Sequence, residues 1–433
     1  MQDFFNKAAY LYYFLRLNFG DAEIMGKART FFNKVLKVQF GEIESFLHGF
    51  YLENREILDE AVAGHVQLSN LRVYFTFLYA INLACEQYSI IERASYQGMP
   101  LNKEAQDKIE IYVTFPSIVY RHGNANDEFA TLFPNLLFFV KDKNVFERCE
   151  VKNFYFDSFG DSFNIGFIPY PKCSVLFERN HEMLVAKSHE TLTSADDLFI
   201  RRCEQAVTEQ KCEIIFGPEM HGSPALENEL EYLCDDDGCK IMICPSYHRM
   251  NTEDGKIYNI TPVYTWITGH LTRSEYIKKF QARMGEFVEG IDEPRIFRLF
   301  VFHIRGFGRI GLFVCRDYLA PEFRTLINRL NFDLVLVSCY SDVTSPFLTQ
   351  MRLDAAGKHL VILGNSCFAQ SSDDKKEAIR PVQYSEHVYN HPKREESCKL
   401  IGDPCSAENC TGSECFRVLH VQIEQEKVLL NII

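Results

Sequence analysis

Three residues of types that act together in covalent catalysis each follow an apolar run in the second half of the sequence. Cys315 ends the run 310–314, Glu219 follows 213–216 through a Gly-Pro pair, and Lys278 follows a Tyr-Ile pair. A thiol can serve as nucleophile, a carboxylate as general base, and a buried ammonium group can stabilise a developing oxyanion. If these side chains meet, they predict one covalent mechanism.

Each residue also has an ordinary interpretation. Cys315 is one of fifteen cysteines, and buried thiols most often serve as small hydrophobic groups. Glu219 could be an exposed turn residue, and Lys278 with Lys279 a solvated pair. Position makes a catalytic Cys315 possible but does not decide between the interpretations, since residues 316–322 indicate a turn into a helix that begins near Pro321. A thiol at a sheet's carboxyl edge near a helix N-terminus is accessible to ligands and favoured as thiolate.

The elements that must position these residues follow from the hydrophobic patterns. Residues 1 to about 90 show helical spacing, and two strands separated by a polar turn are expected between about 100 and 160. After Asp161, strands alternate with amphipathic helices, which predicts an α/β sheet buried on its faces and an edge hairpin near the C-terminus. We therefore predict a mainly helical accessory domain of unassigned role over 1–160 and an α/β domain over 161–433.

Composition excludes several classes of function. The 433 residues carry a formal net charge of −13, which disfavours nucleic acid and anionic membrane surfaces as partners. The N-terminal segment lacks the basic region of a signal peptide, and the longest apolar stretch, 73–85, is too short to span a bilayer. Fifteen cysteines without a secretion signal indicate thiols in a reducing compartment, so we expect a cytoplasmic protein.

Two further motifs are weaker candidates for a binding site. The glycines at 306, 308 and 311 match a dinucleotide-binding pattern, but they precede a strand instead of following one. A loose cluster near the C-terminus could supply four thiolates to zinc, but it lacks the tight C-x-x-C pair that such sites usually contain. We expect a thiol-bearing loop there, and neither a metal nor an organic cofactor. The cluster comprises Cys398, Cys405, Cys410 and Cys415.

The segments that carry the three candidate residues resemble the nitrilase superfamily of carbon–nitrogen hydrolases. The stretch 308–338 resembles the nucleophile region of that family, with its apolar strand, Cys-x-Asp, Pro-Glu and Arg. IIFGPE resembles the strand that ends in the catalytic Pro-Glu, and EYIKKF resembles the Tyr-x-Lys segment, which selects Lys278 over Lys279. The matching nucleophile-region residues are Gly311, Cys315, Asp317, Pro321, Glu322 and Arg324.

The resemblance implies a four-layered αββα sandwich over 161–433 that forms homo-oligomers. It also implies cysteine-dependent hydrolysis of a non-peptide C–N bond in a small molecule through a thioester, with amide favoured over nitrile. Within this scheme His221 and Tyr318 could line the pocket or be structural. The implied catalytic residues are Glu219, Lys278 and Cys315, supported by Glu286, Asp317 and the backbone N–H of Arg316.

Two alternatives stay open. The same three residues could transfer the acyl group to an amine instead of water. The chain could also be an inactive interaction module that binds a protein partner through its N-terminal region, although an intact set of Glu, Lys and Cys disfavours this. Two departures from the family pattern leave the pocket and the oligomer contacts undefined: Arg316, where many relatives carry an aromatic residue, and the stretch 370–415.

Overall fold

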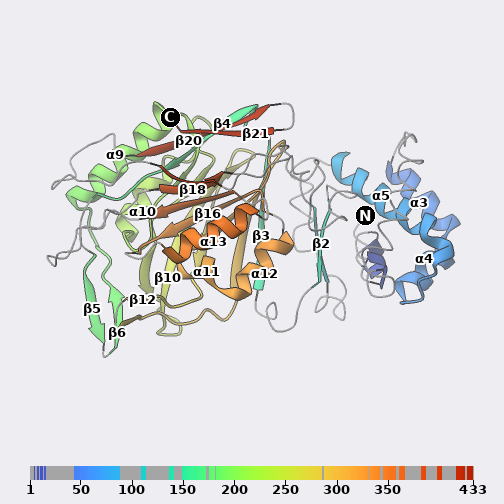
Figure 1. The fold of residues 1–433 in the computed structure, drawn as a ribbon, viewed down its shortest axis with the longest axis horizontal. Helices are drawn as coiled ribbons and strands as arrows, with labels where there is room; N and C mark the ends of the chain where they lie inside the picture. Colours follow the sequence, from blue (N-terminus) through green and yellow to red (C-terminus); the bar gives the residue numbers. More distant parts are fainter. Residues whose placement is uncertain are drawn as a thin grey trace. The chain divides into compact units, whose positions relative to one another are not determined.

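The chain is described from a computed structural model (Figure 1). It divides into two compact units, one comprising 1–157 with 303–308 and the other 158–302 with 309–433. The described residues are 4, 7, 8, 10–12, 14, 15, 43–87, 109–113, 136–140, 149–171, 175–180, 182–284, 287–330, 332–341, 345–356, 360–365, 382–386, 397–401, 416–424 and 427–432.

The first unit contains a helical cluster and short strands. Helices α3 (Ile43–Glu53), α4 (Arg55–Val62) and α5 (Leu71–Gln87) enclose an apolar core, with the short 3-10 helix η1 (Leu68–Asn70) before α5. Strands β1 (Ile109–Val113) and β2 (Leu136–Val140) pair antiparallel, and β3 (Cys149–Phe156) follows. The helices and the two strands expected here are confirmed where residues are described.

The second unit is built on two large sheets. The first has the order β11-β10-β8-β7-β4-β20-β21, with β9 also paired to β10. Parallel pairing joins β4, β7 and β8, whereas β20 and β21 form the antiparallel edge hairpin that the sequence predicts. The strands are β4 (Ser162–Phe167), β7 (Cys212–Phe216), β8 (Ile241–Ile243), β9 (Tyr247–Met250), β10 (Ile257–Ile267), β11 (His270–Ile277), β20 (Arg417–Glu424) and β21 (Lys427–Ile432).

The second sheet carries the order β19-β18-β17-β16-β15-β14 within this unit. Its central strands β15, β16 and β17 are parallel and buried along their whole length, which explains their continuous apolar runs. The strands are β14 (Phe297–Ile304), β15 (Gly308–Val314), β16 (Leu334–Cys339), β17 (Leu360–Asn365), β18 (Val382–Glu386) and β19 (Ser397–Ile401).

The two sheets pack face to face between outer helices. A Cβ atom at Gly364 on β17 would lie 2.3 Å from Phe167 on β4 and 2.6 Å from Phe216 on β7, so the sheets meet closely there. Helices α9 (Ser194–Thr208) and α10 (Pro224–Glu231) cover the first sheet. Helices α11 (Arg316–Leu319), α12 (Pro321–Leu330) and α13 (Ser345–Ala356) lie beside the second sheet (Figure 1). This is the αββα arrangement expected from the sequence.

A small third sheet, not expected from the sequence, has the order β12-β13-β6-β5. Strands β5 (Phe177–Asn180) and β6 (Met183–Ala186) form a hairpin that extends from the sandwich (Figure 1). Strand β6 pairs parallel with β13 (Phe287–Glu289), which also pairs with β12 (Arg283–Met284). The sheet therefore joins the hairpin to the segment just after Lys278.

Two local details differ from the sequence predictions. The segment 268–275 looks like a turn in the sequence, but only Thr268 and Gly269 turn, both at positive φ, and strand β11 starts at His270. Residues 316–319 form the short helix α11 instead of a plain turn. Among the described residues, none of the helices combines the length and apolar character needed to cross a membrane.

Candidate active site

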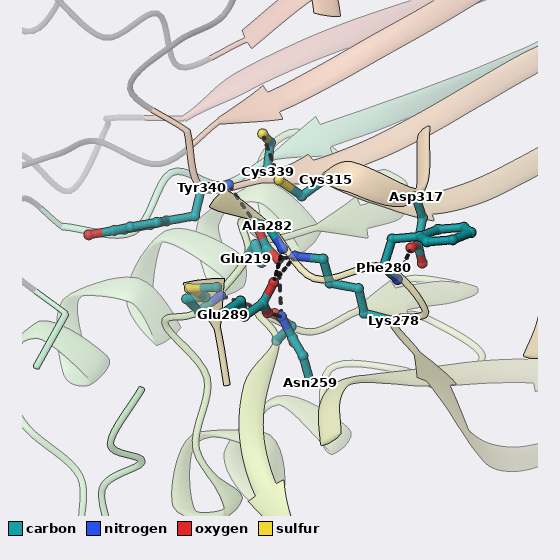
Figure 2. A network of polar contacts seen from close by, with 12 residues as sticks. Glu219, Asn259, Lys278, Phe280, Ala282, Glu289, Cys315, Asp317, Cys339 and Tyr340 are labelled. Carbon is teal, nitrogen blue, oxygen red and sulfur yellow. Dashed lines mark hydrogen bonds and ion pairs between the residues drawn. The ribbon is translucent and has the colours of Figure 1, made fainter. Parts of the chain in front are cut away.

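The three candidate catalytic residues meet in the second unit, together with a second glutamate (Figure 2). Glu219 follows β7, Lys278 follows β11, Glu289 ends β13 and Cys315 follows β15. The Glu219, Lys278 and Glu289 side chains are fully buried, and Cys315 is 5% exposed. Strand ends from all three sheets thus bring a thiol, an amine and two carboxylates to one place.

Lys278 lies between the two carboxylates. Its Nζ is 2.6 Å from Oε1 of Glu219 and 2.5 Å from Oε2 of Glu289. The Asn259 amide spans the same pair, donating to Glu219 at 3.0 Å and to Glu289 at 2.9 Å. Each carboxylate is therefore fixed by both an ion pair and a neutral hydrogen bond.

Electrostatics keep the lysine charged. Burial alone would lower the pKa of Lys278, but the adjacent carboxylates of Glu219 and Glu289 raise it well above its usual 10.5. An ammonium group without water around it exerts a strong field on nearby atoms. Lys278 can therefore stabilise negative charge that develops beside it.

The two carboxylates differ in their affinity for protons. Burial raises the pKa of Glu219, and the charge of Glu289 adds to that shift, while Lys278 opposes it. Burial likewise favours the neutral form of Glu289, but Lys278 and the hydrogen bond from His248 lower its pKa to about 2. The N–H of Ala282 also donates to Glu289 at 2.9 Å. Glu219 is thus the carboxylate suited to take a proton, and Glu289 the permanent anion.

Cys315 is held in a strained turn beside this base. Its backbone has φ 45° and ψ −111°, a conformation rare for residues other than glycine. Its N–H donates to the carbonyl of Ser338 at 2.8 Å, and its thiol hydrogen-bonds to the Glu219 carboxylate. The next N–H, that of Arg316, opens helix α11, where backbone donors have no partner within the helix.

Asp317 connects the nucleophile turn to the lysine segment. Its carboxylate accepts hydrogen bonds from the N–H groups of Phe280 at 2.8 Å and Lys279 at 3.0 Å, and from the hydroxyl of Tyr276 at 2.8 Å. Burial raises the pKa of Asp317 to about 7, against the effect of these donors. The residue therefore supports the site by holding the strand end that carries Lys278.

The two predicted pocket residues are both buried. His221 stacks on Tyr170, with centroids 4.5 Å apart, and meets the edge of Tyr340, whose N–H donates to Glu219. Burial lowers the pKa of His221 to about 3, so its imidazole is neutral. Tyr318 donates its hydroxyl to Asp354. Its ring also lies under the guanidinium of Arg324 and stacks on Phe347.

Sequence reasoning expected the supporting glutamate at position 286, which lies outside the described residues. The carboxylate that contacts Lys278 in the structure belongs to Glu289, three residues later in GEFVEG. Spacing alone could not separate the two, because the choice depends on the pairing of β13 with β6.

Two more residues of the network were missed. Asn259 is a polar residue within the apolar strand β10, which is a signal that the sequence did offer. His248 accepts the N–H of Ala186 at Nδ1, 2.9 Å, so its Nε2 carries the proton and donates to Glu289 at 3.1 Å. No spacing in the sequence indicates that contact.

Metal binding finds no support within the described residues, where no group of three or more His, Cys, Asp or Glu side chains is placed to hold an ion. This result does not test the cysteine cluster near the C-terminus. Cys398 lies on β19, whereas Cys405, Cys410 and Cys415 lie outside the described residues.

No protein-family model matches the chain, and no curated protein does. Among solved structures it is similar to the glutamine-dependent NAD+ synthetase of Acinetobacter baumannii (17% identity, TM-score 0.41), covering 62% of this chain and 47% of the synthetase. It is also similar to an amidase from Nesterenkonia sp. (15%, TM-score 0.33), covering 63% and 89%. A third likeness is to Nit3 of Saccharomyces cerevisiae, a member of branch 10 of the nitrilase superfamily (15%, TM-score 0.35), covering 61% and 91%.

Of these three proteins, Nit3 is named as a member of the superfamily that the sequence resembles. The chain spans about half the length of the synthetase, 47%. With TM-scores of 0.41 and lower, no residue's role is transferred from these proteins.

Proposed function

We propose that this protein hydrolyses a non-peptide C–N bond of a small molecule, an amide in preference to a nitrile, through a thioester on Cys315. The observation that carries the proposal is the contact between the Cys315 thiol and the Glu219 carboxylate, with Lys278 2.6 Å from that carboxylate. A nucleophile, a base and a fixed positive charge are the parts that such a reaction needs.

In the first half-reaction Glu219 takes the thiol proton, and the sulfur of Cys315 attacks the carbonyl carbon. The carbonyl oxygen gains negative charge, which Lys278 and the N–H of Arg316 stabilise. The N–H of Cys315 does not serve here, because it already donates to Ser338 at 2.8 Å. Glu219 then returns the proton to the nitrogen, the C–N bond breaks, and ammonia or an amine leaves a thioester.

In the second half-reaction Glu219 removes a proton from water, whose oxygen attacks the thioester carbon. The C–S bond breaks, the acid is released, and the proton returns to sulfur. Glu289 stays ionised throughout and anchors Lys278 at 2.5 Å, so the ammonium group faces the reacting oxygen in both halves.

The cost of burying these charges supports a catalytic role over an inactive scaffold. Glu219, Lys278 and Glu289 are all 0% exposed, and replacing buried ion pairs with apolar side chains is often neutral or stabilising. A module that only bound partners would gain nothing from this arrangement. Acyl transfer uses the same first half-reaction and differs only in the acceptor.

The test is intact-mass spectrometry of wild type and Cys315→Ser, incubated with a panel of small amides and nitriles while ammonia is measured. We expect ammonia release, or an acyl adduct whose peptide maps to Cys315, with wild type and not with Cys315→Ser. Cys149→Ser is the matched control, because that thiol is partly exposed and lies in the other unit. It should keep wild-type turnover.

Retention of turnover by Cys315→Ser would refute the assignment of the nucleophile. The product formed with a primary amine present separates the two acceptors. A transferase gives the amide and little free acid, whereas a hydrolase gives mainly the acid.

A further inference from the structure

A second thiol lies against the proposed nucleophile. Cys315 and Cys339 stand one residue beyond the last paired positions of the neighbouring parallel strands β15 and β16, where Val314 pairs with Ser338. Their sulfur atoms are 3.8 Å apart and lie side by side in Figure 2. A disulfide has an S–S length of about 2.05 Å, so the sulfurs need to approach by about 1.8 Å. Rotation about the side-chain bonds of two adjacent cysteines can supply this.

The two thiols are unequal. Cys315 is 5% exposed and hydrogen-bonds to the carboxylate of Glu219, whereas Cys339 is 0% exposed and directs its S–H toward the sulfur of Cys315. Burial raises the pKa of Cys339 well above 9.0. Cys315 therefore has both the base and the access needed to react first, with Cys339 next to the product.

We propose that a hydroperoxide oxidises Cys315 and that Cys339 resolves the product into a Cys315–Cys339 disulfide. The hydroperoxide is the oxidant, and the protein groups that this chemistry needs are the two thiols and Glu219. Its effect on turnover, a reversible loss of the nucleophile, rests on the proposed function.

The oxidation proceeds in two steps. Glu219 takes the Cys315 proton, the sulfur attacks one peroxide oxygen, and the O–O bond breaks to give a sulfenic acid and, with that proton, an alcohol or water. The sulfur of Cys339 then attacks the sulfenic sulfur, the S–O bond breaks, and hydroxide leaves with the Cys339 proton as water. Two thiols lose two electrons in all, and the hydroperoxide accepts them.

Hydrogen peroxide titration with mass mapping tests this without reference to turnover. Wild type treated with peroxide, blocked with iodoacetamide and digested without reductant should yield a cross-linked peptide containing Cys315 and Cys339, lighter by two hydrogens. Dithiothreitol should restore alkylation of Cys315. In Cys339→Ala, Cys315 should instead proceed to sulfinic acid, which dithiothreitol does not reverse. If Cys339→Ala folds poorly, Cys339→Ser replaces it, with the same expected result.

Cys239→Ala is the control, since Cys239 belongs to another contacting thiol pair, with Cys234 in the core of the first sheet. It should leave the cross-link unchanged. Absence of the Cys315–Cys339 peptide from oxidised wild type would overturn the proposal, whether Cys315 stays a thiol or overoxidises as in Cys339→Ala. The proposed hydrolysis is unaffected by that result, because it is judged by ammonia and adducts on untreated enzyme.

Discussion

At the scale of single residues, the site depends on an asymmetry between two chemically identical side chains. Glu219 and Glu289 share Lys278 and Asn259, and each accepts a backbone N–H, from Tyr340 and Ala282 respectively. Of the two, Glu289 also accepts from His248, which stabilises its anion and leaves Glu219 as the carboxylate that exchanges protons. A base and a permanent counter-ion are thus made from the same residue type.

This asymmetry predicts the pH dependence of catalysis. Because burial, and then the charge of Glu289, raises the pKa of Glu219, the acid limb of kcat/KM should lie above pH 4.5. Glu289→Gln removes a charge that raises this pKa, so the limb should move to lower pH. It also frees Lys278, and the maximal rate should fall by roughly 10²-fold or more.

The measurement is a pH–rate profile of Glu289→Gln beside that of Glu293→Gln. Glu293 pairs with Lys279 at 3.6 Å on the surface, so its variant changes the same charge without touching the network. An acid limb that stayed in place, or moved to higher pH, in Glu289→Gln would contradict the account of Glu219.

At the scale of elements, the sequence predicted well what depends on strand ends. Glu219 and Cys315 each follow an apolar run, which predicts that each lies at the carboxyl end of a strand. Their strands β7 and β15 belong to different sheets, so it is the face-to-face packing of the two sheets that brings the residues together. Glu289 could not be predicted in the same way, because β13 has only three residues and pairs with the distant β6. Such short elements are specified by tertiary contacts and leave little periodicity in the sequence.

The same limit applies to the hydrogen bonds that cross elements. His248 on β9 contacts Glu289 on β13, and its ring also accepts the N–H of Ala186 on β6, so three distant segments make this contact. The predicted domain boundary at 160 and the role of the N-terminal region stay predictions, although the helices found there follow the expected spacing.

The close packing of the two sheets predicts that a side chain larger than glycine at position 364 destabilises the fold. An added methyl group would lie 2.3 Å from the ring of Phe167 and 2.6 Å from that of Phe216, both in the opposite sheet. Since neither ring can retreat from a packed interior, Gly364→Ala should lower the free energy of unfolding by about 1–3 kcal/mol or more.

Urea denaturation of Gly364→Ala and Gly49→Ala checks this. Gly49 lies within α3 with nothing within 4 Å of its added Cβ, so alanine there should be neutral or stabilising by up to about 1 kcal/mol. Equal stability of Gly364→Ala and wild type would mean that the sheets are not in close contact at this point.

At the scale of the whole molecule, buried carboxyl groups connect the site to the stability of the fold. Asp317 has a pKa of about 7 when folded, against an ordinary value of 3.8, so between these values the folded state holds a proton that the unfolded state releases. Stability from this group therefore falls as pH rises from 3.8 to about 7. Glu289 acts with the opposite sign, because its pKa of about 2 makes stability fall as pH drops below 4.5.

Asp317→Asn separates the two effects, since a neutral amide of the same shape cannot ionise. Across the range from pH 3.8 to about 7, the wild-type free energy of unfolding should decline more steeply than that of the variant, by up to about 1.4 kcal/mol per pH unit. Below that range the variant should lose any advantage, because wild-type Asp317 is then neutral in both states. Denaturant titrations over this interval measure the two slopes. Parallel slopes would show that Asp317 is ionised in the folded protein, and that the donors from Phe280, Lys279 and Tyr276 outweigh its burial.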